Sequence, residues 1–167
     1  MLKEKIKIDL MAAVRAGDEL TRSTLRMLNA AILNREKDKR YKIAKAEPLF
    51  KEEELVEKSQ LTDVEIVEVL FSEIKKRQEA AFEFEKGKRL DLSEKEKKEA
   101  EMLKKYLPEM AAEEEIRRLA KTAIAETGAK EIRDMGRVMA ELVPKLKGRA
   151  DGSLISKVVK DLLTAGL

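Results

Sequence analysis

Apolar residues recur every three or four positions along most of the chain, the spacing that places one face of an α-helix in a core. Near the N-terminus, Ile6, Leu10 and Val14 follow this spacing. Because glycine adopts the left-handed conformation at little cost, Gly17 is expected to end this helix. Asp18 can then cap the next helix through its carboxylate. The chain therefore begins with two helices joined by a tight turn.

A break in the pattern separates this pair from a second pair of helices. The second helix has a short buried face made of Leu25, Leu28 and Ile32. The spacing is lost over residues 41–61, which include Pro48, and we interpret this stretch as a connection with some helical content. Thr62 and Glu65 have the spacing of a capping box, so a new helix is predicted to begin there.

The next helix is long and is followed by a shorter one. Its predicted buried positions are Val64, Val67, Phe71, Ile74, Gln78 and Ala81. The helix is expected to reach about Glu85 and to stop at Gly87. Ser93 and Glu96 predict the start of the following helix as a second capping box, and Pro108 ends it. We expect a domain boundary at this proline, after an N-terminal helical hairpin or bundle domain over residues 1–108.

Three shorter helices are predicted after Pro108, over residues 109–167. Three acidic residues, Glu113–Glu115, complement the dipole of the first helix, and Gly128 can end it. The other two helices have apolar faces made of Met135, Val138, Met139, Leu142 and Leu146, and of Leu154, Val158 and Leu162. Pro144 is expected to bend or end the middle helix, because proline has no amide donor.

Composition supports an all-α fold, because 41% of the 167 residues are charged and only 4% are aromatic. The chain has no Cys and no His, so thiolate and imidazole metal sites and the usual catalytic base are missing. We expect no metal and no cofactor. The net charge of +3 is too small to drive strong nonspecific binding to nucleic acid, so any RNA affinity must come from local clusters.

The distribution of charged and apolar residues also predicts where in the cell the protein is located. The N-terminal residues are charged where a secretory signal needs an apolar stretch. No run approaches the roughly 20 apolar residues of a membrane span. We therefore expect no membrane partner and a cytoplasmic location.

The most distinctive stretch is the bend between the last two helices, residues 145–152, which contains Lys145, Lys147, Gly148, Arg149 and Asp151. Together with residues 135–139 and 158–163, it resembles the GatB/YqeY tail domain. That tail is shared by the B subunit of tRNA-dependent amidotransferases and by free-standing YqeY-like proteins. Residues 24–32 and 106–108 resemble the N-terminal helices of the YqeY-like proteins, so the resemblance covers nearly the whole chain. The connection near residues 43–60 and Ala112, where the family often has Ser or Thr, depart from it.

The resemblance implies an association with tRNA and a binding role only, since the tail packs on tRNA while other domains perform amidotransfer. Three to five phosphate contacts from this chain would bind RNA only weakly. It implies RNA contacts from the residues of the bend named above. Lys157 and Lys160 on the following helix could join them, and free backbone amides there could meet phosphate. The structural alternative is that Gly148 and Asp151 only cap helices and that the lysines only face a helix dipole.

Other interpretations compete with this one. The basic run Arg35–Arg40, followed by Tyr41, is better explained as a solvated helix end than as an RNA patch. Ser72 and Lys75 match a Ser-x-x-Lys motif, and Ser153 or Ser156 lies near Lys157, but no oxyanion loop accompanies them. Amidotransfer also needs a nucleophile and a phosphate site that the sequence lacks. The alternative to RNA binding is a helical adaptor that presents an N-terminal groove to a partner protein.

Overall fold

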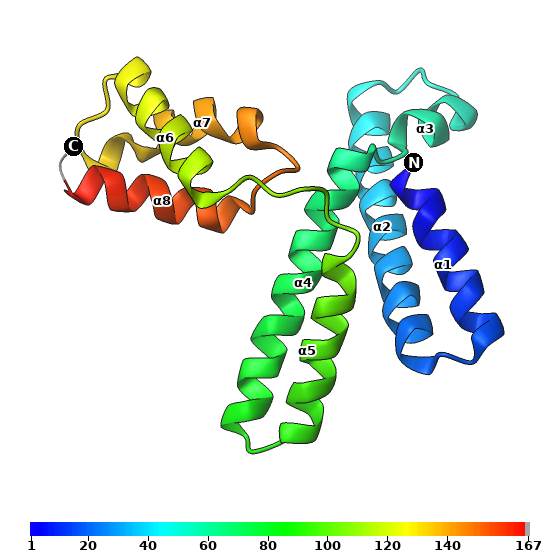
Figure 1. Cartoon of the computed structure of the whole chain (residues 1–167). Helices are drawn as coiled ribbons and strands as arrows, with labels where there is room; N and C mark the ends of the chain where they lie inside the picture. The colour runs from blue at the N-terminus through cyan, green and yellow to red at the C-terminus, as the bar shows by residue number, and fades with distance from the viewer. Residues whose placement is uncertain (166–167) are drawn as a thin grey trace. The chain divides into compact units, whose positions relative to one another are not determined.

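In a computed structural model of the chain, residues 1–165 are described, and they form eight α-helices and one 3-10 turn without a strand (Figure 1). The predicted all-α fold is confirmed. These residues divide into two compact units, Met1–Leu107 and the part from Pro108 onward. None of the described helices is long and apolar enough to cross a membrane.

The first unit consists of two helical hairpins and a short helix between them (Figure 1). Its elements are α1 (Leu2–Ala16), α2 (Glu19–Ala46), α3 (Glu52–Ser59), α4 (Asp63–Lys86) and α5 (Leu90–Lys104). Its core collects side chains from four of these helices: Ile6, Leu25, Leu28, Ile32, Ile66, Leu70, Ile74, Ala100 and Leu103. This core joins the α1–α2 hairpin to the α4–α5 hairpin.

Local capping signals placed three helix ends correctly. Gly17 ends α1 with φ 69°, in the left-handed region. The Asp18 carboxylate accepts a hydrogen bond of 3.0 Å from the Thr21 amide and begins α2. At the start of α4, the Glu65 carboxylate accepts from the Thr62 amide at 2.8 Å, and the Thr62 hydroxyl accepts from the Glu65 amide. Each signal works because both partners lie within one helical turn.

The predicted capping box at Ser93 and Glu96 is wrong. Helix α5 already begins at Leu90, and the Ser93 amide donates to the Arg89 carbonyl at 3.0 Å as an interior residue does. The turn is so tight, with Lys88 at φ 58°, that the helix restarts earlier than the motif indicated. The Ser93 hydroxyl is buried and has no hydrogen-bond partner among the described residues.

Some predicted buried faces are also displaced. Val14 is exposed, because α1 packs through Ile6 and Ala13. In α4, Val64 and Gln78 are exposed and Phe71 is only half-buried. This helix packs against both α2 and α5, so its buried face is wider than a heptad seam and includes Ile66, Leu70, Glu73 and Arg77.

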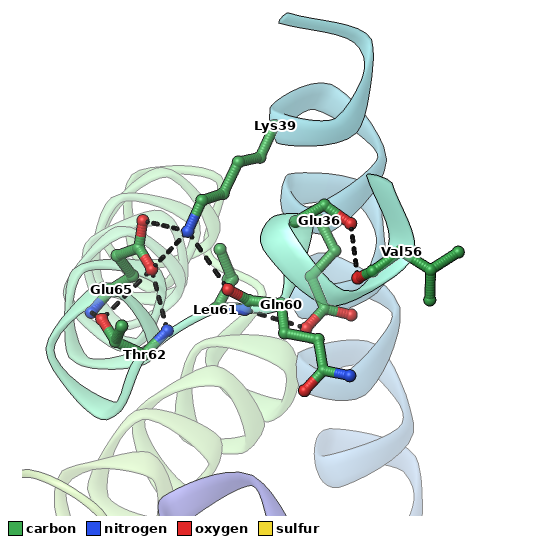
Figure 2. A network of polar contacts seen from close by, with 8 residues as sticks. Glu36, Lys39, Val56, Gln60, Leu61, Thr62 and Glu65 are labelled. Carbon is green, nitrogen blue, oxygen red and sulfur yellow. Dashed lines mark hydrogen bonds and ion pairs between the residues drawn. The ribbon is translucent and has the colours of Figure 1, made fainter. Parts of the chain in front are cut away.

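The predicted connection over residues 41–61 is mostly helical, since α2 continues to Ala46 and α3 follows it. Polar contacts hold this segment against α2 (Figure 2). Buried Glu36 accepts from the Leu61 amide at 3.1 Å and from the Lys3 ammonium at 2.6 Å. Lys39 donates to the Gln60 carbonyl at 3.1 Å and to Glu65 at 2.8 Å. These contacts fix the start of α4 directly from α2.

The second unit is a three-helix arrangement with its own core. It contains α6 (Glu113–Thr127), a 3-10 turn (Ile132–Asp134), α7 (Met135–Leu146) and α8 (Gly152–Ala165). Gly128 ends α6 with φ 64°, as predicted, and α7 ends at Leu146, shortly after Pro144. The most deeply buried core side chains are Ile116, Ala120, Ile124, Val138, Leu142, Leu146, Ile155 and Val159.

A buried guanidinium joins the two helices of the second hairpin. Arg77 of α4, 5% exposed, donates to Glu99 of α5 at 3.1 Å and to the Glu73 carboxylate at 3.0 Å. Glu99 is only 2% exposed. Burial would raise the pKa of Glu73, but its contacts with Lys76 and Arg77 lower it below the ordinary value. One arginine therefore contacts two buried carboxylates, and Lys76 adds a second cation beside Glu73.

We predict that Arg77→Ala lowers the free energy of unfolding by about 3–5 kcal/mol, because it leaves Glu99 charged and unpaired in the core. Lys98→Ala is the matched control: it breaks the exposed ion pair with Glu94 and should cost less than about 1 kcal/mol. Urea unfolding of both variants measures the difference. Equal midpoints for the two variants would contradict the prediction.

Candidate functional site

The bend between α7 and α8 is built by backbone constraints. Gly148 has φ 76°, a conformation that residues with a side chain rarely adopt. The amides of Arg149 and Ala150 both donate to the Leu146 carbonyl, at 2.9 and 3.1 Å. The Arg149 carbonyl in turn accepts from the Ala111 amide at 2.8 Å, which ties the bend to the segment before α6. The bend is thus a fixed part of the second unit.

Asp151 acts as the cap of α8. Its carboxylate accepts from the Ser153 amide at 2.6 Å and also from the Ser153 hydroxyl. The Asp151 carbonyl accepts the first helical bond from Ile155 at 3.0 Å. The Ser153 amide, one of the backbone donors predicted to meet phosphate, therefore already has Asp151 as its acceptor. The structure assigns this residue a capping role.

Two of the predicted cations are engaged by carboxylates of their own unit. Arg149 forms a bidentate pair with Glu115, at 3.1 and 3.0 Å. Lys145 contacts Glu141 at 2.8 Å and Glu126 at 3.2 Å. The hydrogen bonds to Glu141 and Glu126 raise the pKa of Lys145, so it remains charged.

The partners of these two cations show that they do not form a single cluster. Glu115 lies near the start of α6 and Glu126 near its end. At a rise of about 1.5 Å per residue, the two positions are roughly 16 Å apart along the helix. Lys145 and Arg149 therefore reach toward opposite ends of α6.

The other predicted cations lie on exposed surface. Lys147 follows the end of α7, and Lys157 and Lys160 lie on α8. Within the described residues, no ion pair or hydrogen bond engages the side chains of Lys157 and Lys160. Because residues three apart share a helix face, these two ammonium groups present one cationic edge of α8 to solvent.

Sequence reasoning missed the acidic partners. Glu141 and Lys145 are four residues apart, a spacing that signals an ion pair within a helix. The pairing of Glu115 with Arg149 is tertiary, and no local spacing could reveal it.

The sequence analysis also did not predict that the basic run after Arg35 makes structural contacts. Arg40 contacts Glu52 at 3.1 Å and, with Lys39, holds the segment around α3 in place.

A groove of about 540 Å³ lies between α2 and α4 in the first unit. Its apolar lining comes from Met27, Ala30, Ala31 and Val69, and its polar lining from Asn34, Arg35, Asp38, Glu68, Ser72, Glu73 and Lys76. Across residues 1–165, no group of three or more acidic, Cys or His residues is arranged to hold a metal ion. The groove thus combines a short apolar strip with several charged and polar side chains.

Comparison with known proteins gives a family match. A family model described as "Yqey-like protein" matches residues 46–163. A Pyrenophora tritici-repentis protein named "Altered inheritance of mitochondria protein 41, mitochondrial" is 29% identical over 166 residues, covering 96% of this chain and 80% of the relative. A Clavispora lusitaniae protein of the same name is 30% identical over 118 residues, covering 70% of this chain and 58% of the relative. An uncharacterized Schizosaccharomyces pombe protein is 45% identical over 51 residues, covering 30% of this chain and 42% of the relative.

The names of two relatives contradict the predicted cytoplasmic location, because both proteins are described as mitochondrial. The prediction tested for a secretory signal and a membrane span, which are long apolar stretches. A mitochondrial targeting segment is amphipathic and rich in arginine instead. The test on which the prediction depended therefore could not distinguish the two compartments.

We predict that Gly148→Ala destabilises the second unit by about 1–2 kcal/mol, since a Cβ atom disfavours the left-handed backbone. Gly136→Ala is the control, because Gly136 is helical and a Cβ atom there meets nothing within 4 Å. This second change should stabilise the protein by about 0.5–1 kcal/mol. Thermal unfolding gives both signs, and a stabilising Gly148→Ala would show that the bend does not require glycine at this position.

Proposed function

The chain belongs to the YqeY-like protein family, and we propose that it is a non-catalytic accessory protein that binds tRNA weakly through its last three helices. The observation that carries the proposal is the cationic edge of α8, where Lys157 and Lys160 are exposed and unpaired within the described residues. The resemblance of residues 135–163 to the tail of the amidotransferase B subunit supports tRNA as the ligand. We assign residues 109–167 to that tail domain.

Weak binding is consistent with the number of available charges. Lys157 and Lys160 are exposed and have no ion pair within the described residues, whereas Lys145, Lys147 and Arg149 already have interaction partners. Two phosphate contacts correspond to a slope of roughly −2 for the logarithm of affinity against the logarithm of salt concentration. Recognition would therefore depend on the shape and phosphates of folded RNA more than on its bases.

A second candidate is the helical adaptor, and the groove between α2 and α4 favours it. A partially apolar groove on a helical surface is suited to an amphipathic helix from another protein. The adaptor would use the first unit and the RNA-binding role the second, so variants in one unit should leave the other activity intact.

We predict that Lys157→Ala combined with Lys160→Ala weakens binding to folded tRNA and reduces the magnitude of the salt slope by about 2, one for each lost contact. Arg118→Ala with Lys121→Ala is the control. It removes two exposed cations of α6 that have the same three-residue spacing. Filter binding at several salt concentrations measures both. Equal losses from the two double variants, or equal affinity for tRNA and a scrambled RNA, would exclude this site.

The Glu115–Arg149 pair yields a separate prediction. Glu115→Gln removes the negative charge that neutralises Arg149, so it should raise RNA affinity and steepen the salt slope by up to about 1. Glu113→Gln removes a carboxylate that pairs instead with Arg117 and serves as control. The same binding assay compares them. Unchanged affinity in Glu115→Gln would mean that Arg149 does not reach RNA.

A further inference from the structure

Helix α2 carries an exposed aromatic side chain in its last two turns. Tyr41 is 71% exposed. Within residues 1–165, its hydroxyl group has no hydrogen-bond partner, and its ring has no contact with another ring or with a cation. Aromatic side chains stabilise a protein mainly through the area that they bury, so Tyr41 contributes little to the first unit. An aromatic ring on the surface is instead suited to stacking with a planar group of a ligand.

Lysines lie over three other aromatic rings of the same unit. The distances from the ammonium nitrogen to the ring centre are 4.1 Å for Lys86 and Phe82, 4.8 Å for Lys58 and Phe50, and 5.6 Å for Lys5 and Tyr106. Lys45 follows Tyr41 by four residues, the spacing at which Lys86 follows Phe82. In the described chain, however, neither Lys45 nor another cation covers the Tyr41 ring. The Tyr41 ring therefore differs from these three in having no cation over it.

The structure separates the basic run of α2, which the sequence predicts as a solvated helix end, into two groups. Lys39 pairs with Glu65 at 2.8 Å (Figure 2), and Arg40 pairs with Glu52 at 3.1 Å. Arg35 lines the groove between α2 and α4. The remaining cations of residues 35–45 are Lys37, Lys42 and Lys45.

Two of these lysines lie one helical turn on either side of Tyr41. Lys37 precedes it by four residues and Lys45 follows it by four, so the three side chains share one face of α2. The two lysine positions are about 12 Å apart along the helix axis, with the ring midway between them. Both lysines are exposed, and neither has an ion pair or a hydrogen bond in the part of the chain that the structure describes. The three side chains form a row that faces solvent, with a cation on each side of the ring.

Two carboxylates lie near this row and do not pair with it. Asp38 is three residues before Tyr41 and lines the α2–α4 groove. Glu47 follows the last residue of α2. Among residues 1–165, neither carboxylate forms an ion pair. Lys42, which follows Tyr41 directly and is also exposed, adds a third positive charge. The surface around the ring is therefore cationic.

We propose that Lys37, Tyr41 and Lys45 form a binding site for single-stranded RNA. One unpaired base stacks on the Tyr41 ring, and the phosphates on either side of that nucleotide contact the two ammonium groups. A duplex does not fit this site, because its bases are already stacked on one another. An acidic peptide would engage the lysines but would leave the ring without a planar partner. The site lies in the first unit, apart from the cationic edge of α8, and only the choice of RNA over DNA rests on the proposed function.

Variants of the ring test the stacking, with a labelled single-stranded RNA of about 8–10 nucleotides as the probe. Tyr41→Ala should weaken binding by about 5- to 100-fold in fluorescence anisotropy, through loss of one stacked base. Tyr41→Phe should bind almost as the original chain does, because the ring is kept. Phe82→Ala is the matched control: Phe82 is 57% exposed, but Lys86 already lies over its ring, so its loss should leave binding unchanged. Both aromatic positions are exposed, and circular dichroism should show that every variant stays folded.

Tyrosine fluorescence gives a second readout of the same contact. The chain has two tyrosines and no tryptophan. Tyr106 is only 9% exposed and donates its hydroxyl proton to Asp9. Stacking of a base on Tyr41 should therefore quench part of the tyrosine emission when RNA is added. Tyr41→Phe should keep the affinity and lose the quenching, a combination that a purely electrostatic contact does not produce.

The salt dependence tests the two lysines. Lys37→Ala combined with Lys45→Ala should reduce the magnitude of the salt slope by about 1.4, or about 0.7 for each lost contact with a single strand. Lys75→Ala with Lys105→Ala is the matched control, since it removes two exposed lysines of the same unit that lie outside α2. This second change should leave the slope as it is.

Several outcomes would overturn the site. They are unchanged binding in Tyr41→Ala, binding by Tyr41→Phe as weak as that by Tyr41→Ala, and a duplex, a polyglutamate or a single-stranded DNA that binds more tightly than the RNA. Lys157→Ala combined with Lys160→Ala should leave the Tyr41-dependent part of RNA binding intact. If single-strand binding is lost in that variant and kept in Tyr41→Ala, it belongs to α8. The site on α2 and the tRNA-binding role of α8 therefore fail on different variants.

Discussion

The architecture of the first unit depends on the buried contacts of one guanidinium. Arg77 binds carboxylates on two helices, α4 and α5, and its remaining edge faces the Met27 sulfur of α2. Because a charge inside a core is costly without a partner, this arrangement favours one mutual position of the three helices. The apolar residues around it supply most of the cohesion, but they could slide, whereas the hydrogen bonds of Arg77 have fixed directions. The contacts of Arg77 with Glu73 and Met27 therefore help to set the distance between the two helices that line the groove.

How far the sequence predicted this fold depended on how local each signal was. Gly17, Asp18 and the Thr62–Glu65 pair were found because each acts within one helical turn. Ser93 was misread because the same spacing also occurs inside a helix, and only the tight turn at Lys88 decides where α5 begins. The helical content of residues 41–61 was underestimated, since the contacts of Glu36 and Lys39 that stabilise it come from distant sequence.

The candidate site shows the same division. The need for glycine at position 148 and the capping role of Asp151 follow from the chain around the bend. The positive charge that the bend presents to a ligand cannot be read from the local sequence, because it depends on Glu115 and Glu126 of a different helix. A list of cations in a motif therefore overstates the positive potential of its surface. Lys157 and Lys160 keep their charge available because no carboxylate of the described residues pairs with either of them, although Asp161 follows Lys160 on α8.

The polar network that fixes Leu61 and Thr62 against α2 has an evolutionary consequence (Figure 2). Since Glu36 and Lys39 hold the start of α4 directly, the register of α4 does not depend on the length of the loop between α2 and α3. Leu49 in that loop is 96% exposed. Lineages are therefore free to expand or trim the chain at this place, and a reporter or affinity tag inserted there should leave the helical framework undisturbed.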